Sequence, residues 1–239
     1  ALPILYRASI SSNCALSSCM IFSSSCTVYG EPKGQKEVTE ETPKNLPNSP
    51  YGFTKWMGEQ IIDDTFVSNS NLKLIKLRYF NPVGAHKSAL IGELPIGRPQ
   101  NLVPAITQTA IGKLPKMQVH GADYDTRDGS CIRDYIHVCD IAHAHTLAIQ
   151  YSIQQNQPNS CEVFNLGTGN GITVLEAINA FEKVSGVQLN YEIGPRRAGD
   201  IVSIYANNDH AVQKLGWHCQ YNLEDMMRTA WQWEQSLAK

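Results

Sequence analysis

The feature that most restricts the fold of this chain is the alternation of strand-like and helix-like segments along its length. Strand-like segments are rich in β-branched and aromatic residues, whereas helix-like segments repeat apolar residues every three or four positions. The expected strands are residues 20–24, 72–79, 131–138, 162–166 and 187–193. The expected helices are residues 50–67, 101–111, 140–152, 174–186, 209–215 and 223–237. Such alternation predicts an α/β protein.

The start of the helix at residues 50–67 has clear local signals. Ser49 suits the N-cap position, and Pro50 suits the first turn, where its missing N–H costs nothing. Phe53, Met57 and Ile61 follow at intervals of four residues. We expect these three side chains to form the stripe that faces the core.

Tyr51 and Lys55 lie one helical turn apart at the start of this helix and share one of its faces. Hydride chemistry at a hydroxyl needs a base. A phenol with a pKa of about 10 is protonated at neutral pH, so it cannot act as that base unless a nearby ammonium group lowers its pKa. Ser25 ends the preceding strand and could donate a hydrogen bond to the same reacting oxygen. This combination of residues indicates a catalytic site rather than a surface pair.

Composition and charge exclude several classes of function. The 239 residues carry a formal net charge of −2, which argues against a nucleic-acid partner bound by bulk electrostatics. No apolar run is long enough to cross a bilayer, so no membrane role is expected. Any anionic ligand must therefore be bound by a few well-placed arginines. The seven cysteines are scattered without metal-ligand spacing, and they indicate reduced thiols in a cytoplasmic protein without a metal.

The first part of the chain is unusual for an α/β protein. Its apolar start could suggest a secretory signal, but the apolar stretch is short and no basic region precedes it. Residues 4–20 have a helical pattern that runs directly into the strand at 20–24 without a turn. We therefore hypothesise that residues are missing near Cys19–Ile21.

The chain contains no glycine-rich dinucleotide-binding turn after a first strand. Neither G-x-x-G-x-x-G nor G-x-G-x-x-G occurs, and the nearest glycine cluster, at residues 167–171, has the wrong spacing and position. Such a turn, with the helix behind it, usually binds the pyrophosphate of a dinucleotide. The sequence thus holds the tyrosine–lysine pair without the segment that would bind cofactor phosphates.

Six segments together resemble the extended short-chain dehydrogenase/reductase superfamily, and within it the UDP-glucose (UDP-galactose) 4-epimerase family. They are residues 22–30 (FSSSCTVYG), 49–55 (SPYGFTK), 78–86 (RYFNPVGAH), 101–104 (NLVP), 128–138 (DGSCIRDYIHV) and 195–200 (PRRAGD). The resemblance implies a partial Rossmann-type parallel sheet, with its first strands missing, and a smaller mixed α/β substrate-binding domain. We expect tight NAD binding and activity only if the missing half is supplied.

The resemblance also implies a reaction and the residues that perform it. Tyr51 would take the proton from the 4-hydroxyl of the sugar, Lys55 would lower the pKa of Tyr51 and touch the nicotinamide ribose, and Ser25 would polarise the 4-oxygen. The cofactor-binding residues would be Ser23, Ser24, Tyr51, Lys55, Tyr79 and Phe80. Because the sugar is oxidised and then reduced, NAD would remain bound throughout.

The UDP-sugar would be bound by residues from several segments. By resemblance these are Asn81, Asn101, Leu102, Gln118, His120, Arg133, Arg197, Asp200 and Ile204. Arginine suits a diphosphate because its planar guanidinium donates paired hydrogen bonds. Ile204 would occupy the position that gates N-acetylated sugars. Residues 84–101, a long loop rich in glycine and proline, are also expected to contact a ligand.

The expected domains are discontinuous along the chain. Residues 1–83 and 134–170 would form the remnant of the dinucleotide-binding domain, and residues 84–133 and 171–239 would form the UDP-sugar-binding domain. Ser25, Cys26 and Thr27 stand where related dehydratases carry acidic residues, which favours plain epimerisation. The alternatives are a catalytically impaired relative that binds UDP-sugars, a UDP-GlcNAc 4-epimerase and a two-substrate reductase. The resemblance also implies a possible homodimer.

Overall fold

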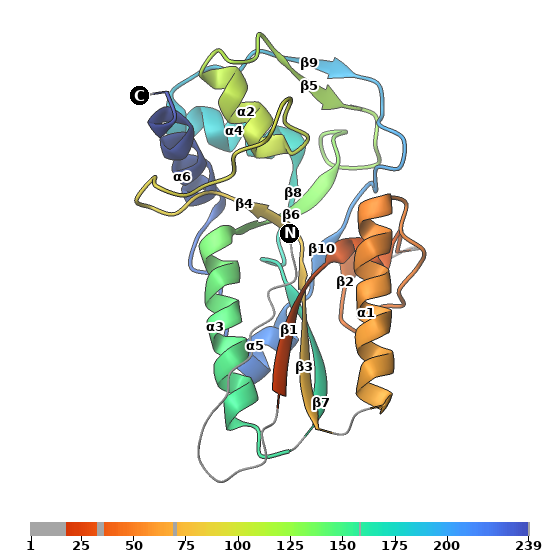
Figure 1. The fold of residues 1–239 in the computed structure, drawn as a ribbon. Coiled ribbons are helices and arrows are strands. Elements are labelled where there is room, and N and C mark those ends of the chain that lie inside the picture. The colour runs from red at the N-terminus through yellow and green to blue at the C-terminus, as the bar shows by residue number, and fades with distance from the viewer. Residues whose placement is uncertain (1–17, 33–35, 69–70, 158, 239) are drawn as a thin grey trace. The chain divides into compact units, whose positions relative to one another are not determined.

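The computed structural model of the chain describes residues 18–32, 36–68, 71–157 and 159–238. These residues form two compact units (Figure 1). Unit 1 comprises residues 1–80, 142–167 and 206–218, and unit 2 comprises residues 81–141, 168–205 and 219–239. The chain therefore passes repeatedly from one unit to the other.

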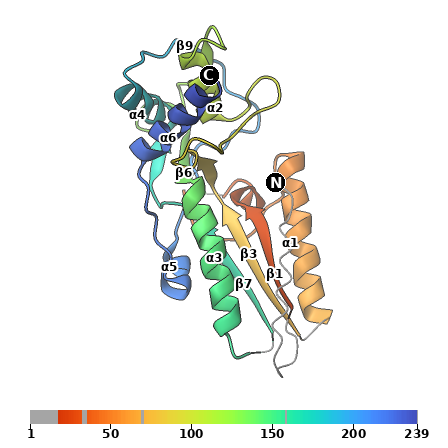
Figure 2. The same cartoon turned by 60° about the vertical axis from the view of Figure 1, so that its left-hand side comes forward.

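Unit 1 is built on a parallel three-stranded sheet. Its strands lie in the order β1 (Ser18–Ser25), β3 (Leu72–Tyr79) and β7 (Ser160–Leu166). β1 and β3 pair residue for residue, from Ser18 opposite Leu72 to Ser25 opposite Tyr79. Figures 1 and 2 show α1 (Pro50–Ser68) on one face of this sheet and the unit 1 part of α3 (Val138–Gln154) on the other. The carboxyl ends of all three strands thus lie at one edge.

The remaining elements of unit 1 are short. Cys26–Tyr29 form a 3₁₀ helix, η1, directly after β1, and α5 (Asp209–Leu215) packs against β7. The two-residue strand β2 (Glu37–Val38) pairs with β10 (Tyr205–Ala206). A small apolar cluster of Phe22, Ile62 and Leu74 lies between α1 and the sheet.

The buried face of α1 is not the one that its apolar residues predict. Phe53, Met57 and Ile61 are exposed, with relative accessibilities of 41%, 40% and 65%. The buried residues of the helix are instead Gly52, Lys55, Glu59 and Ile62. The prediction of an inward Phe53–Met57–Ile61 stripe is therefore wrong, because this helix directs two charged side chains towards polar partners in the sheet.

The partner of Glu59 is Arg78 near the end of β3. Arg78 donates from Nε to Oε1 at 2.9 Å and from Nη2 to Oε2 at 2.7 Å, which gives a bidentate pair that is almost fully buried. Ser24 on β1 donates to the same carboxylate at 2.6 Å, and Arg78 also donates to the Tyr29 hydroxyl at 2.9 Å. Tyr29 in turn donates to Asn165 on β7 at 2.6 Å. This network joins α1, η1 and all three strands.

Unit 2 combines three helices with two small sheets. β4 (Asn81–Val83) pairs in parallel with β6 (Ile132–His137), which pairs in antiparallel fashion with β8 (Gly171–Thr173). β5 (Met117–His120) and β9 (Tyr191–Gly194) form a second parallel pair. The helices are α2 (Leu102–Ala110), α4 (Val174–Ser185) and α6 (Leu223–Ser236).

The core of unit 2 lies where these three helices pack on the small sheets. Its buried members are Val83, Val103, Ile106, Met117, Val119, Tyr135, Ala177, Ile178, Phe181, Leu189, Met226, Met227 and Ala230. Trp231 is partly buried, packs against this cluster and meets Phe181 edge to face, with the ring centroids 5.5 Å apart. The aromatic pair therefore links α4 to α6.

The predicted helices are present, but the strand expected at residues 187–193 is confined to β9, and the short strands β2, β4, β5, β8 and β10 were not predicted. Thr173 and Glu176 form a capping box at the start of α4, and Gly186 ends this helix in the left-handed conformation. The α/β class and the parallel sheet are confirmed. Through Cys19–Ile21, β1 pairs with β3 without interruption, so the structure shows no break at that point. The helical pattern expected for residues 4–20 falls mostly outside the described residues.

The observed units divide the chain at different points from the expected domains. Residues 206–218 belong to unit 1 because α5 packs on β7, whereas residues 134–141 and 81–83 belong to unit 2 because β4 and β6 pair there. The six cysteines among the described residues form no disulfide. Within the described parts of the chain, no helix has the length and apolar character needed to cross a membrane.

The buried pair predicts a specific sensitivity of the fold. In Glu59→Gln the Arg78 guanidinium stays buried without its counter-charge, so the free energy of unfolding is expected to fall by about 3–5 kcal/mol. The measurement is urea unfolding followed by circular dichroism. Asp64→Asn, an exposed change on the same helix, is expected to change that free energy by less than about 0.5 kcal/mol. Equal free energies of unfolding for the two variants would show that the Glu59–Arg78 pair does not stabilise the fold.

The same pair gives this prediction a pH dependence. Burial alone would raise the pKa of Glu59, but hydrogen bonds and charge from Arg78 outweigh burial and lower it. A carboxyl with a lowered pKa stabilises the fold above its unfolded-state pKa, and this stabilisation is lost as the pH falls through its folded-state pKa. Acidification should therefore destabilise the wild-type protein more than Glu59→Gln.

Candidate functional site

The first turn of α1 positions two of the predicted catalytic side chains. The Gly52 N–H donates to Ser49 Oγ at 3.1 Å, so Ser49 caps the helix that Pro50 begins. Tyr51 lies on the outer side of this turn and is half-exposed, whereas Lys55, one turn later, is buried. The Lys55 ammonium lies 5.7 Å from the centroid of the Tyr51 ring. It donates to the backbone oxygen of Ser23 at 2.9 Å.

Ser25 joins these residues at the end of β1. Its hydroxyl is hydrogen-bonded to the Tyr51 phenol and also accepts the Thr27 N–H at 3.3 Å as the cap of η1. Ser25 is itself buried. The structure therefore brings Ser25, Tyr51 and Lys55 together at the carboxyl end of the parallel sheet in unit 1.

The electrostatics of Tyr51 differ from the sequence-based expectation. Burial raises the pKa of Tyr51 above its ordinary value, and the hydrogen bond with Ser25 opposes that rise. Burial lowers the pKa of Lys55. In this structure the Lys55 ammonium donates to the Ser23 carbonyl, and the pKa of Tyr51 is raised rather than lowered. Ser25 is the group that favours the phenolate here.

The predicted cofactor-binding residues fall on different faces of β1 and β3. The Tyr79 hydroxyl donates to Ser23 Oγ at 2.7 Å, on the same side of the sheet as Ser25. Ser24 points to the opposite side, where it donates to Glu59. Phe80 is buried, and its N–H donates to the Leu166 carbonyl oxygen at 3.2 Å. The structure groups Ser23 and Tyr79 with the catalytic residues but does not place the Ser24 side chain among them.

Sequence reasoning missed one polar residue of this group. His145 Nε2 lies 2.8 Å from the Tyr79 hydroxyl, which brings α3 into contact with β3. Burial raises the pKa of Tyr79 to about 12, so this phenol stays protonated at neutral pH. No local pattern identifies the pair, because its members are 66 positions apart in the chain.

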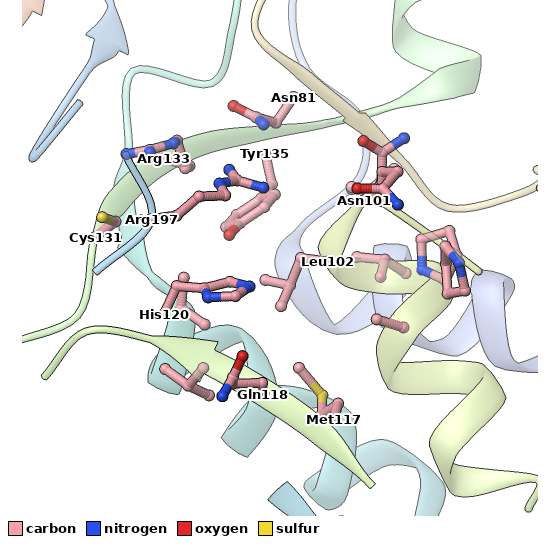
Figure 3. A pocket seen from close by; sticks show the side chains of 18 of the residues that line it. Asn81, Asn101, Leu102, Met117, Gln118, His120, Cys131, Arg133, Tyr135 and Arg197 are labelled. Carbon is pink, nitrogen blue, oxygen red and sulfur yellow. The ribbon is translucent and has the colours of Figure 1, made fainter. Parts of the chain in front are cut away.

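A cavity of about 510 Å³ in unit 2 collects most of the predicted substrate-binding residues. Eight of the nine line it: Asn81, Asn101, Leu102, Gln118, His120, Arg133, Arg197 and Asp200. They come from β4, the start of α2, β5, β6 and the segment after β9. Figure 3 shows Arg133, Arg197 and His120 around the same space, with Asn101 and Leu102 across from them. Ile204 is buried and does not belong to the lining.

The two predicted arginines of this cavity share one partner, because Asp200 Oδ1 lies 3.6 Å from Arg133 Nη2 and 2.7 Å from Arg197 Nη2. Arg133 donates from Nη1 to the backbone oxygens of Ile132 and Ile201, at 2.8 and 2.6 Å. Arg197 donates to Asp200 at 2.7 Å, and this hydrogen bond raises the pKa of the Arg197 guanidinium further. The side chain of Arg197 is 54% exposed, so it can also reach a ligand.

Other residues of the lining carry no signal in the sequence patterns considered above. Glu93 and Arg98 come from the loop at residues 84–101, which was expected to contact a ligand and which lines this cavity. Glu93 accepts a hydrogen bond from Asn101 Nδ2 at 2.6 Å. Tyr135 and Lys116 also belong to the lining. The cavity thus combines cationic, amide and aromatic side chains, which suits a ligand with both anionic groups and a planar ring.

The chain is similar to UDP-glucose 4-epimerases of known sequence and structure. It is 46% identical over 215 residues to the UDP-glucose 4-epimerase of Bifidobacterium longum, a match that covers 90% of this chain and 62% of that protein. A solved structure of UDP-glucose 4-epimerase from Stenotrophomonas maltophila, with bound NAD and formylated UDP-arabinopyranose, is 47% identical with a TM-score of 0.87. That match covers 92% of this chain and 64% of the other.

The Bifidobacterium longum enzyme solved in complex with NAD⁺ and UDP is similar as well. It is 45% identical with a TM-score of 0.86, over 91% of this chain and 64% of that one. The chain therefore spans a little under two thirds of the length of these relatives. Their fold supports the assignment of the parallel sheet in unit 1 to a partial Rossmann domain.

A family model matches almost the whole chain. The model described as GDP-mannose 4,6 dehydratase matches residues 5–230, which include both units. The chain therefore belongs to this family of the extended short-chain dehydrogenase/reductase superfamily.

Proposed function

We propose that this chain carries the catalytic and UDP-sugar-binding residues of a UDP-glucose 4-epimerase, an isomerase that interconverts UDP-glucose and UDP-galactose. The observation that carries the proposal is the cavity of unit 2, which eight of the nine predicted substrate-binding residues line. The similarity to enzymes of that name, at 45% to 47% identity, also supports it.

The lining of the cavity suits a nucleoside diphosphate. Arg133 and Arg197 offer fixed positive charge to the diphosphate, and a guanidinium can donate two parallel hydrogen bonds to one phosphate. Asn101 and Gln118 offer amide donors and acceptors for a uracil ring or a ribose. Tyr135 and His120 add rings that can pack on a base. These are the chemical requirements of a UDP group.

The residues of unit 1 fit the nicotinamide end of NAD. Tyr51 and Lys55 lie at the carboxyl end of parallel strands, the edge at which α/β proteins bind nucleotides. Lys55 would contact the nicotinamide ribose, and it donates to the backbone oxygen of Ser23, whose side chain accepts from Tyr79 on the face of the sheet that α3 covers. When bound, NAD supplies an acceptor for a hydride from sugar carbon four and later returns it. The glycine-rich turn that binds the pyrophosphate is not in this sequence.

The acid–base work would fall to Tyr51. Its phenolate takes the proton of the 4-hydroxyl as the sugar is oxidised, and the phenol returns a proton when the 4-keto group is reduced. Burial disfavours the phenolate, so Ser25 must offset that effect through its hydrogen bond to the same oxygen. The Lys55 ammonium, 5.7 Å from the ring, adds a positive charge in the same direction. Both supporting groups are buried, which keeps them fixed.

The residues after Ser25 favour epimerisation over the dehydration that the family description suggests. Dehydration needs an additional acid and base, but Cys26 and Thr27 stand at the positions that would provide them. The second candidate function is a module that binds UDP-sugars without converting them, for which the cavity of unit 2 alone would suffice. UDP-GlcNAc is the alternative substrate. An assay of the chain with UDP-galactose and with UDP-GlcNAc shows which of these two sugars is converted.

We also propose that two copies of the chain associate through α1. Phe53, Met57 and Ile61 form an exposed apolar stripe on this helix of 19 residues. Isolated apolar residues are common on surfaces, but a contiguous stripe favours contact with another protein surface. We also propose a cytoplasmic location, where cysteines that form no disulfide, such as the six described ones, are usual.

The catalytic assignment predicts the effect of removing one oxygen. Tyr51→Phe is expected to lower the rate of UDP-galactose conversion by at least about 10²-fold, because no base remains for the 4-hydroxyl. The rate is measured with NAD supplied, and UDP affinity is measured by calorimetry. UDP affinity should not change. Tyr191→Phe removes another tyrosine hydroxyl on β9 and serves as the matched control. Full activity in Tyr51→Phe would rule out the proposed base.

The cavity predicts a separate effect on binding. Arg197→Gln is expected to weaken UDP binding by roughly 10- to 100-fold, because a charge-assisted hydrogen bond to phosphate is lost. Calorimetric titration with UDP provides the measurement. Arg228→Gln, which removes an exposed arginine paired with Asp225 on α6, should leave the affinity unchanged. If UDP binds both variants equally, the diphosphate is not bound where we propose.

The stripe on α1 predicts the oligomeric state. Ile61→Glu is expected to convert a dimer into a monomer, because a carboxylate in an apolar interface is costly to desolvate. Sedimentation velocity measures the mass. Gln60→Glu introduces the same charge at the neighbouring exposed position and should preserve the dimer. A wild-type monomer, or a dimer that survives Ile61→Glu, contradicts this interface.

A further inference from the structure

His145 forms the end of a continuous line of polar contacts within unit 1. Its Nε2 lies 2.8 Å from the Tyr79 hydroxyl, and the Tyr79 hydroxyl lies 2.7 Å from Ser23 Oγ. The backbone oxygen of Ser23 then accepts the Lys55 ammonium at 2.9 Å. Contacts therefore run from α3 through β3 and β1 to the catalytic turn of α1.

The direction of these hydrogen bonds follows from a count of protons. A phenol carries one proton, and Tyr79 donates it to Ser23 Oγ. The phenolic oxygen can then only accept at its contact with His145. His145 must therefore donate from Nε2, which fixes the Nε2–H form of the ring. Ser23, having accepted from Tyr79, keeps its own hydroxyl proton available for another acceptor.

His145 is not needed to satisfy the buried proton of Tyr79, because Ser23 already accepts it. What the imidazole adds is orientation. A second hydrogen bond at the phenolic oxygen fixes the direction of its O–H towards Ser23. Since the Ser23 carbonyl also anchors Lys55, a shift of Ser23 would move the ammonium away from Tyr51. A displacement of about 1 Å in the position of a catalytic group can lower the reaction rate about 10²-fold.

We propose that His145 is a positioning residue for the candidate reaction. It donates from Nε2 to Tyr79 and through Tyr79 holds Ser23 in place. Ser23 in turn holds Lys55 beside the base Tyr51. The role rests on the proposed epimerase function, because it concerns the geometry of that base.

The first experiment compares two replacements of His145 in the protein supplied with NAD. His145→Leu fills much of the space without a donor, and it is expected to lower kcat for UDP-galactose by about tenfold. KM should stay within about twofold, since the cavity of unit 2 is unaltered. His145→Gln keeps an N–H donor near the Nε2 position and should recover most of the rate. His143→Leu, the same change two residues earlier on α3, is the matched control.

A double variant tests whether His145 acts through Tyr79. If it does, His145→Leu combined with Tyr79→Phe is no slower than Tyr79→Phe alone. The proposal would be overturned if the loss of rate in the double variant equalled the product of the losses in the two single variants. A His145→Gln variant no faster than His145→Leu would also overturn it. Thermal unfolding is recorded for every variant. A loss of rate that follows loss of stability in both His145 variants would mean that the residue is merely structural.

A spectroscopic readout does not depend on turnover. With ¹⁵N-labelled histidine, His145 should give the nitrogen shifts of the Nε2–H form, and Tyr79→Phe should move the Nε2 signal. An Nδ1–H ring would overturn the assignment of His145 as donor. A wild-type protein that binds NAD and UDP but converts no sugar would overturn the proposed function instead. An active wild type with a fully active His145→Leu would overturn the positioning role alone.

Discussion

The buried pair of Glu59 and Arg78 is the interaction on which the geometry of unit 1 depends. It joins the middle of α1 to the end of β3, and the same carboxylate binds Ser24 on β1. One residue on either side of Ser24, the side chains of Ser23 and Ser25 project from the other face of the strand. A polar network on one face of the sheet thus fixes the strand whose Ser23 and Ser25 side chains project from the other face.

Much of this fold could be predicted from the sequence because its local signals agree with its tertiary structure. Proline at a helix start, a capping box and a terminal glycine each satisfy backbone groups locally, so α1 and α4 begin where their residues indicate. The orientation of α1 could not be predicted in this way. Apolar periodicity assumes that charged residues face water, but Lys55 and Glu59 have buried partners that lie far away in the sequence.

The candidate site divides along similar lines. Tyr51 and Lys55 form a local pattern, and strand alternation alone could have separated Ser24 from its two neighbours. The residues that line the cavity were predicted from the resemblance of several segments to a known family, because no periodicity links Asn101, at the start of α2, to Arg197, after β9. Glu93, Tyr135 and His145 escaped notice for the same reason. Their roles depend on contacts that only the folded chain creates.

The interleaving of the two units has a consequence for how this chain can be divided. The chain crosses between units after residues 80, 141, 167, 205 and 218, so each unit is assembled from three separate stretches. Neither could be produced as one contiguous fragment, and a single proteolytic cut would sever one stretch without releasing a whole unit. Such a chain also requires many distant segments to meet before either core is complete, which slows folding relative to a protein of two successive domains.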